Sequence, residues 1–202
     1  MPHPKKNLII YGCGGHARSL ADVALANGIE HLIFVDDQAR PGEKCFGFDV
    51  IKNISLEPAA ICIVAVGDNQ KRAALFELLQ KNIVALISDR AYVGKNAEID
   101  KGVLVGHGAH VGPNTKIGVN TIVNTHCVIE HDCVIGKHSH ISVNSVVAGK
   151  CEIGDFVMIG AGATVIDGVK ISSHVIVGSG AVVVKDITEP GTYVGVPAKK
   201  VK

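Results

Sequence analysis

The segment NTHCVIEHDCVIG, residues 124–136, gathers the side chains of this chain that are best suited to chemistry. His126 and His131 lie five residues apart, and Asp132 directly follows the second histidine. Imidazole titrates nearest to neutral pH, so a histidine can take the proton of an attacking amine or hydroxyl group. Two histidines at this spacing could instead hold a metal ion. The segment alone leaves three interpretations open: a general base at His131, a metal site, and repeat residues without a chemical role.

The segment lies inside a regular six-residue repeat. From Val93 to Val183 every sixth residue is Val or Ile, and the fourth residue after each of them is small or β-branched. Glycine often follows the aliphatic residue, as expected where the chain turns a corner after each short strand. This period is the hexapeptide signature of a parallel β-helix, in which three hexads make one coil and the aliphatic side chains stack inside. The small inward positions include Cys127, Cys133 and Cys151, which we expect to be buried free thiols.

The residues before the repeat predict a small α/β domain. Residues 7–28 read as a strand, a glycine turn and a helix. Further strands are predicted within 31–37, 59–68 and 83–87, and a second helix within 69–82. We therefore predict a Rossmann-like domain at 1–86, followed by an all-β β-helix at 87–202.

The first turn of this domain carries a ligand-binding motif. Gly12, Gly14 and Ala17 match the pattern G-x-G-x-x-[GA] between a strand and a helix, and Asp36 follows about twenty residues later. A helix start offers free N–H groups to a phosphate. The domain is too short for a full dinucleotide-binding fold, so a mononucleotide or a nucleotide sugar is favoured over NAD.

Composition excludes several other classes of function. The formal net charge is +1 and aromatic residues make up 4% of the chain, so neither a basic surface nor stacking platforms for bases are indicated. The apolar run near the start is too short for a signal peptide or a membrane span, which predicts a cytoplasmic protein without membrane insertion. The cysteines form no C-x-x-C pair and are expected to stay reduced.

The whole chain resembles the PglD and NeuD type sugar acetyltransferases. The resemblance is carried by IYGCGGHA (10–17), FVDD (34–37), NTHCVIEHDCVIG (124–136) and GVPAKKV (195–201). It implies a left-handed β-helix and acetyl-CoA as co-substrate. The implied activity is N-acetylation of a nucleotide-linked 4-amino sugar, of the UDP-4-amino-4,6-dideoxy-sugar type, for bacterial surface glycans or glycoproteins.

The resemblance also implies roles for individual residues. His131 corresponds to the family's base and Asp132 to the acid that raises its basicity. Gly149 lies 18 positions beyond His131, one coil further, where a bare backbone N–H could meet the developing oxyanion. Acetyl-CoA is expected to contact His140, Gly149, Ala161 and Ser179. The nucleotide sugar is expected at Gly14, Gly15, His16, Asp36, Asp37 and Asn124, although a structural role is the simpler interpretation of Asn124.

The chain is expected to assemble with copies of itself, and three alternative functions stay open. A reactive groove between two β-helices predicts a homotrimer. The other outward histidines, at 107, 110, 126, 138 and 174, are expected to be mostly solvated. O-acetylation of sialic-acid-like sugars is the main alternative. A zinc site like that of the γ-class carbonic anhydrases, for which His126 and His131 have the spacing, is a remote one because Arg90 stands at the third-histidine position; no metal is expected. A non-catalytic sugar-nucleotide sensor is the third alternative.

Overall fold

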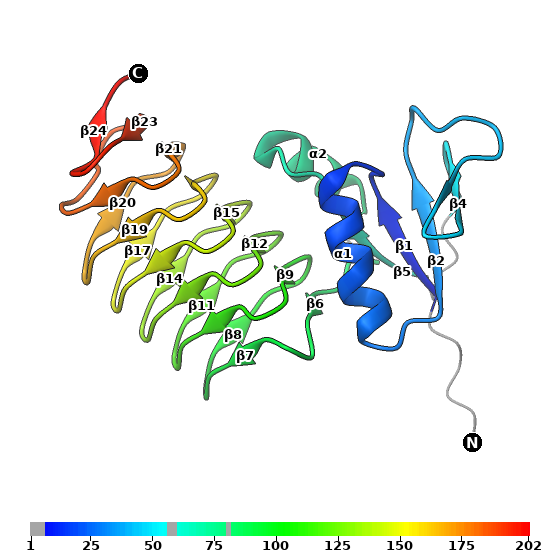
Figure 1. Cartoon of the computed structure of the whole chain (residues 1–202), viewed down its shortest axis with the longest axis horizontal. Helices are drawn as coiled ribbons and strands as arrows, with labels where there is room; N and C mark the ends of the chain where they lie inside the picture. Colours follow the sequence, from blue (N-terminus) through cyan, green and yellow to red (C-terminus); the bar gives the residue numbers. More distant parts are fainter. Residues whose placement is uncertain (1–6, 56–59, 80–81) are drawn as a thin grey trace.

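The computed structural model describes residues 7–55, 60–79 and 82–202, and it consists of a small α/β domain docked against a β-helix (Figure 1). The N-terminal sheet has the strand order β3-β4-β2-β1-β5. Its strands are β1 (Asn7–Tyr11), β2 (His31–Val35), β3 (Lys44–Cys45), β4 (Phe48–Ile51) and β5 (Ile61–Val64). The pairs β1–β2, β1–β5 and β2–β4 are parallel, whereas β3 and β4 form an antiparallel hairpin that the sequence patterns did not predict.

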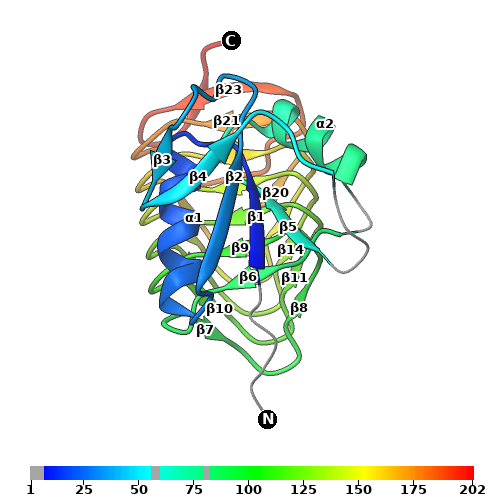
Figure 2. The ribbon, with the colours of Figure 1, turned by 90° about the vertical axis from the view of Figure 1, so that its right-hand side faces the viewer.

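Two helices accompany this sheet. The first, α1 (Gly15–Ala26), starts directly after the glycine turn, and the second, α2 (Asn69–Leu79), follows β5. The predicted helix at 69–82 and the predicted strand at 59–68 are therefore present, while residues 80–81 and Ala59 lie outside the described residues. α1 lies between the sheet and the β-helix (Figures 1 and 2).

The β-helix has three walls, each a sheet of short strands from successive coils. The wall nearest the N-terminal domain, here called the covered face, has the order β24-β23-β21-β18-β15-β12-β9-β6. Its strands are β6 (Leu86–Ile87), β9 (Leu104–Val105), β12 (Ile122–Val123), β15 (His140–Ile141), β18 (Met158–Ile159), β21 (Val175–Val177), β23 (Gly191–Val194) and β24 (Lys199–Lys200). All neighbours in it are parallel except the terminal pair β23–β24.

The other two walls differ in the side chains that they turn outward. The apolar face consists of β7 (Tyr92–Val93), β10 (His110–Val111), β13 (Val128–Ile129), β16 (Val146–Val147), β19 (Thr164–Val165) and β22 (Val182–Val183). The charged face consists of β8 (Glu98–Ile99), β11 (Lys116–Ile117), β14 (Val134–Ile135), β17 (Glu152–Ile153) and β20 (Lys170–Ile171). On the charged face Lys116 pairs with Glu98 at 3.2 Å and Lys170 with Glu152 at 2.8 Å.

The interior and the corners of the coils follow the hexad. The repeated aliphatic residues and the three predicted cysteines, Cys127, Cys133 and Cys151, are buried in one core, and the cysteines are free. The turn residue is the third after the aliphatic one, and many of these have positive φ, including Asn96, Asn114 and Asp132. Asn and Asp tolerate that left-handed conformation better than most residues.

The glycines directly after the aliphatic residues were expected to supply the turn conformation, but they are not among the glycines with positive φ. A Cβ at Gly106 would lie 2.9 Å from the backbone N of Thr125 in the next coil. These glycines are therefore required by the close approach of stacked coils, and the expectation that they supply the turn conformation was wrong.

The two domains share a hydrophobic core. Leu104 and Ile122 point outward from the covered face, and they are buried with Leu8 and Leu20 of the N-terminal domain in a single cluster. Polar contacts reinforce this junction: His107 lies 2.6 Å from the Ser88 hydroxyl and 3.2 Å from the carboxylate of Asp22 on α1.

Arg72 of α2 joins the domains through buried hydrogen bonds. The residue is 1% exposed. Its guanidinium donates to the β-helix carbonyls of Asn120 (2.9 Å), His138 (2.8 Å) and Ser139 (3.0 Å). Within its own domain it donates to the carbonyls of Val66 and Gly67, both at 3.1 Å, and to Asn69 Oδ1 at 2.7 Å. Burial lowers the pKa of Arg72 to about 10, so the group stays charged at neutral pH.

Replacement of Arg72 tests this junction. Arg72→Met should lower the free energy of unfolding by about 3 kcal/mol or more, because several buried carbonyls lose their donor at about 1–3 kcal/mol each. Urea unfolding at fixed protein concentration measures the change. The control is Arg40→Met in the same domain, since Arg40 has an 82% exposed side chain and pairs with nearby Glu43; such a surface pair contributes about 0–1 kcal/mol. Equal losses in both variants would contradict the assigned role of Arg72.

Candidate active site

His131 lies at the corner where the chain passes from the apolar face to the charged face, just after β13. Its Nδ1 is 2.8 Å from Asp132 Oδ2, and the two side chains are 44% and 45% exposed. The Asp132 side chain thus reaches the imidazole. The hydrogen bond from His131 is the main cause that lowers the pKa of Asp132, so Asp132 is a carboxylate at neutral pH. A carboxylate only accepts hydrogen bonds, which assigns the imidazole proton to Nδ1 and leaves the lone pair on Nε2.

Gly149 stacks one coil beyond His131 and leaves room for the imidazole ring. A Cβ at Gly149 would lie 2.8 Å from His131 Cε1 and Nε2, and 2.9 Å from Asp167 Oδ1. Among the described residues no hydrogen bond is formed to the backbone N–H of Gly149. The backbone of Gly149 and the imidazole of His131 therefore lie side by side, and the roles predicted for them stay predictions.

A second group of predicted residues meets where the N-terminal domain covers the β-helix. His16 at the start of α1 and His140 on β15 have ring centroids 6.2 Å apart, and Asn124 Nδ2 lies 3.0 Å from His140 Nε2. Burial, followed by the charge of Arg72, lowers the pKa of His16 to about 4 and that of His140 to about 3. Both imidazoles are neutral at pH 7 and can bind a ligand only through uncharged hydrogen bonds. His16 Nε2 is buried without a hydrogen-bond partner among the described residues.

The two groups occupy different sides of the same chain. His131 follows a strand of the apolar face, whereas His140 points outward from the covered face. Ala161 and Ser179 lie at a third place, the corner between the covered and apolar faces, where Gly162 and Gly180 also leave open space. One chain brings His131, Asp132 and Gly149 together. The other residues expected to bind acetyl-CoA (His140, Ala161 and Ser179) and those expected to bind the sugar lie elsewhere in the chain.

The glycine turn presents an open helix start. Gly14 is the N-cap of α1 without a side-chain cap, and the first turn of the helix has no acidic residue. A Cβ at Gly14 or Gly15 would meet nothing within 4 Å. Asp36, which was expected to face a base or ribose, instead accepts hydrogen bonds from the backbone N–H groups of Cys13 (2.9 Å) and Gln38 (3.0 Å). Asp37 is exposed beside it.

Two of the outward histidines are not solvated as expected. His107 contacts Ser88 and Asp22 at the domain junction. His138 is 4% exposed, and Asn120 Nδ2 lies 2.9 Å from its Nδ1. Packing of the N-terminal domain on the covered face shields His107 partly and His138 almost completely from water.

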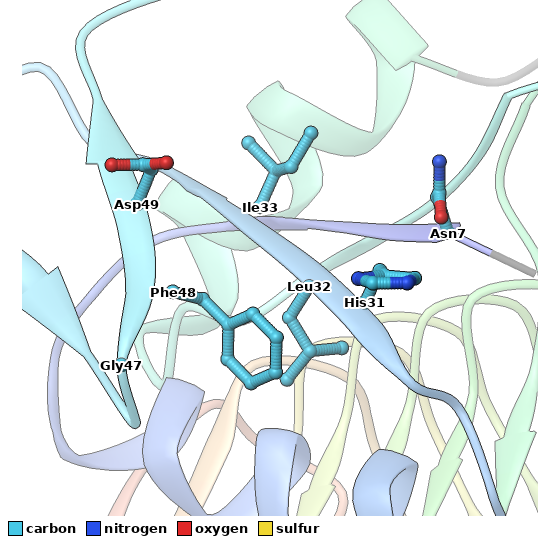
Figure 3. A pocket seen from close by; sticks show the side chains of 7 residues that line it. All are labelled: Asn7, His31, Leu32, Ile33, Gly47, Phe48 and Asp49. Carbon is cyan, nitrogen blue, oxygen red and sulfur yellow. The ribbon is translucent and has the colours of Figure 1, made fainter.

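A surface cavity of about 490 Å³ lies away from these groups. It is lined by Asn7, His31, Leu32, Ile33, Gly47, Phe48 and Asp49. Figure 3 shows Leu32 and Phe48 pointing to one side of the strands, and Ile33 and Asp49 to the other. The cavity lies at the amino-terminal ends of β1 and β2, whereas the glycine turn and Asp36 follow their carboxyl-terminal ends. None of the predicted site residues lines it.

The alternative histidine pair is separated by a strand. His126 lies at the corner before β13 and His131 at the corner after it. Within residues 7–55, 60–79 and 82–202, no three His, Cys, Asp or Glu side chains are grouped as a metal site would require. The same ranges contain no helix long and apolar enough to cross a membrane.

Sequence reasoning missed two residues that act on these groups. Asn114 donates from Nδ2 to Asp132 Oδ1 at 3.0 Å, and it lies 18 residues, one coil, before Asp132. The 18-residue step that located Gly149 could have found Asn114 as well. Arg72 carried no such signal, because a single arginine in a helical stretch is ordinarily a surface residue.

Both parts of the chain match models of known protein families. Residues 7–79 match the PglD N-terminal domain. Residues 86–118 match the hexapeptide repeat of succinyl-transferase, and residues 150–185 match the bacterial transferase hexapeptide. Fold and repeats therefore define a hexapeptide-repeat acyltransferase.

Solved structures narrow this class. The acetyltransferase domain of PglB from Neisseria gonorrhoeae is 32% identical, with 97% of this chain and 100% of that chain covered and a TM-score of 0.92. A histidine-to-alanine variant of GDP-perosamine N-acetyltransferase from Caulobacter crescentus, in complex with CoA and GDP-perosamine, is also 32% identical, with 97% of each chain covered and a TM-score of 0.90. The chain belongs to the PglD-type sugar acetyltransferases.

The two buried histidines predict an acid-sensitive domain junction. An imidazole with an ordinary pKa of 6.5 when unfolded, but about 4 (His16) or about 3 (His140) when folded, binds more protons in the unfolded state below pH 6.5. Stability is therefore lost as the pH falls from 6.5, by about 2 kcal/mol per histidine at pH 5. The drop in the urea midpoint between pH 7 and pH 5 should be smaller in His16→Gln than in the native protein. Parallel losses in both proteins would refute this assignment.

Proposed function

We propose that this chain is an acetyl-CoA-dependent N-acetyltransferase of a nucleotide-linked 4-amino sugar, with His131 as general base. The observation that carries the proposal is the His131–Asp132 pair stacked on Gly149, in a chain whose relatives include an N-acetyltransferase of GDP-perosamine. The UDP-4-amino-4,6-dideoxy sugars are the substrate class that we favour, in the cytoplasmic assembly of bacterial surface glycans or glycoproteins. Because that relative was crystallised with a GDP sugar, the assay must compare UDP, dTDP and GDP sugars.

Each residue of the base group has a defined task. Acetyl-CoA supplies the acetyl group as a thioester, whose thiolate is a good leaving group. His131 Nε2 takes the proton from the sugar amine as the amine attacks the thioester carbonyl. Asp132 accepts from Nδ1 and stabilises the imidazolium. The Gly149 N–H is available to the oxyanion that develops on the carbonyl oxygen.

A homotrimer would complete the site. The apolar face turns a continuous row outward without cover from the N-terminal domain: Tyr92, His110, Val128, Val146, Thr164 and Val182. In a ring with three-fold symmetry, one edge of this face meets the opposite edge of the same face in the next subunit. The His131 corner of one subunit would then approach the corner of the next that carries Ala161 and Ser179. The small side chains there suit an extended pantetheine arm, with His140 and Asn124 beside it on the covered face.

The N-terminal domain would bind the nucleotide. We assign residues 1–86 to a Rossmann-like nucleotide-sugar domain and residues 87–202 to a left-handed β-helix. The phosphates would lie against the open helix start at Gly14 and Gly15, with His16 and Asp37 nearby. Asp36 would act mainly by holding the turn, since both of its oxygens accept backbone N–H groups.

The alternatives make different predictions in one assay. Release of free thiol from acetyl-CoA is measured with UDP-, dTDP- and GDP-4-amino sugars and with free sialic acids. Turnover only with sialic acids would indicate an O-acetyltransferase, and nucleotide-sugar binding without turnover would indicate a sensor. A stoichiometric zinc ion in elemental analysis, whose removal by a chelator abolishes activity, would support the metal site at His126 and His131.

Removal of the base gives the central test. His131→Ala should lower kcat by about 10²- to 10⁴-fold, the usual contribution of a general base, while both ligands still bind. Gly149→Ala should also lower kcat, because its methyl group would displace the imidazole, but it should add little in the His131→Ala background. Initial rates and calorimetry measure the two effects. A kcat above about a third of the native value in His131→Ala would exclude this base.

A side chain at the glycine turn tests the nucleotide site. Gly14→Val places its side chain in open space and should leave the fold intact, but it should block the approach of a phosphate to the helix start. KM for the sugar nucleotide should rise and KM for acetyl-CoA should stay nearly unchanged, which makes acetyl-CoA the internal control. If Gly14→Val binds the nucleotide sugar as tightly as the native protein in calorimetry, the glycine turn is not the sugar-nucleotide site.

A further inference from the structure

Three residues at one corner of successive coils form a hydrogen-bonded ladder that ends at the base. Asn96, Asn114 and Asp132 are each 18 residues apart and have φ values of 60°, 57° and 58°. Asn96 Nδ2 donates to Asn114 Oδ1 at 3.2 Å, and Asn114 Nδ2 donates to Asp132 Oδ1 at 3.0 Å. The other oxygen of Asp132 lies 2.8 Å from His131 Nδ1.

The ladder has a fixed direction. Asp132 is ionised and only accepts, so the Asn114 amide must turn its NH₂ group toward Asp132 and its oxygen toward Asn96. Asn96 supplies the donor for that oxygen and thereby disfavours the flipped amide. The hydrogen bond from Asn114 is the second cause, after His131, that lowers the pKa of Asp132, and the Lys150 ammonium group adds to it.

Orientation matters because the His131–Asp132 pair is exposed. The two side chains are 44% and 45% exposed, so packing alone does not hold them in one rotamer. The side-chain hydrogen bonds of Asp132 are those to His131 and Asn114. Without Asn114, the carboxylate could rotate and exchange its contact with His131 for water.

We propose that Asn114, supported by Asn96, is a positioning residue that holds Asp132 against His131 Nδ1 and so keeps the proton off Nε2. This inference rests on the proposed function of His131 as base. Asn114 touches neither substrate. It acts through Asp132 on the tautomer of the base.

Glycine substitutions test the ladder without straining the corner, since glycine readily adopts positive φ. Asn114→Gly should lower kcat about 5- to 30-fold, less than the 10²- to 10⁴-fold contribution of the base itself. Asn96→Gly should have a smaller effect in the same direction. The matched control is His174→Gly, which has φ 61° at the corner between the charged and covered faces, away from His131; His174 is exposed and its ring stacks on Phe156. All rates are measured at saturating acetyl-CoA.

A double variant separates positioning from a general loss of structure. In the Asp132→Gly background, Asn114→Gly should cause no further loss of kcat, because the residue through which it acts is already absent. An additive loss would overturn the proposal. So would an equal loss of kcat in His174→Gly.

Nitrogen NMR of histidine-labelled protein reads the tautomer directly, without any acetyl transfer. At a pH where the imidazole is neutral, His131 of the native protein should carry its proton on Nδ1, and in Asn114→Gly the Nε2–H form should gain population. The His131→Ala spectrum assigns the signal. An unchanged tautomer in Asn114→Gly refutes the positioning role, whereas a changed tautomer in a protein without acetyltransferase activity would refute the proposed function alone.

Discussion

The buried Arg72 guanidinium is the interaction on which the arrangement of this molecule depends. It is satisfied by carbonyl oxygens and one amide oxygen, from both its own domain and the β-helix. Carbonyl dipoles solvate the cation but do not neutralise it. Its charge therefore remains in the junction, where it helps to lower the pKa of His16, His138 and His140. Burial is the main cause that lowers the pKa of these histidines, and the charge of Arg72 adds to it, so the side chain that links the domains also favours neutral histidines between them.

The 18-residue coil arranges the chemistry along columns. His131, Gly149 and Asp167 succeed one another along one column, and Asn96, Asn114 and Asp132 along the next. The left-handed corner conformation favours Asn and Asp, so the repeat itself supplies polar side chains at regular spacing. A base and its supporting residues can then evolve by substitution at positions that the fold already holds fixed.

The features that could be predicted from the sequence are those that follow from its local period. The hexad placed the β-helix, its buried cysteines and the adjacency of His131 and Gly149, because each follows from a step of 6 or 18 residues. It did not reach the contacts between domains. Arg72 meets β-helix acceptors 48 to 67 residues away, and His107 and His138 are shielded by a domain whose docking no period encodes. The hairpin β3–β4 was missed because its strands of two and four residues are too short to show an alternation.

The three walls of the β-helix differ in what lies against them. The covered face is used by the N-terminal domain, and the charged face pairs Lys116 with Glu98 and Lys170 with Glu152 in contact with water. The described residues of the N-terminal domain do not cover the apolar face, which we propose as the contact with another copy of the chain. Its two edges carry different residues, the base group at one edge and the small side chains of Ala161 and Ser179 at the other. In the proposed homotrimer these unlike edges would meet, and the base group of one subunit would approach the small side chains of the next at every contact.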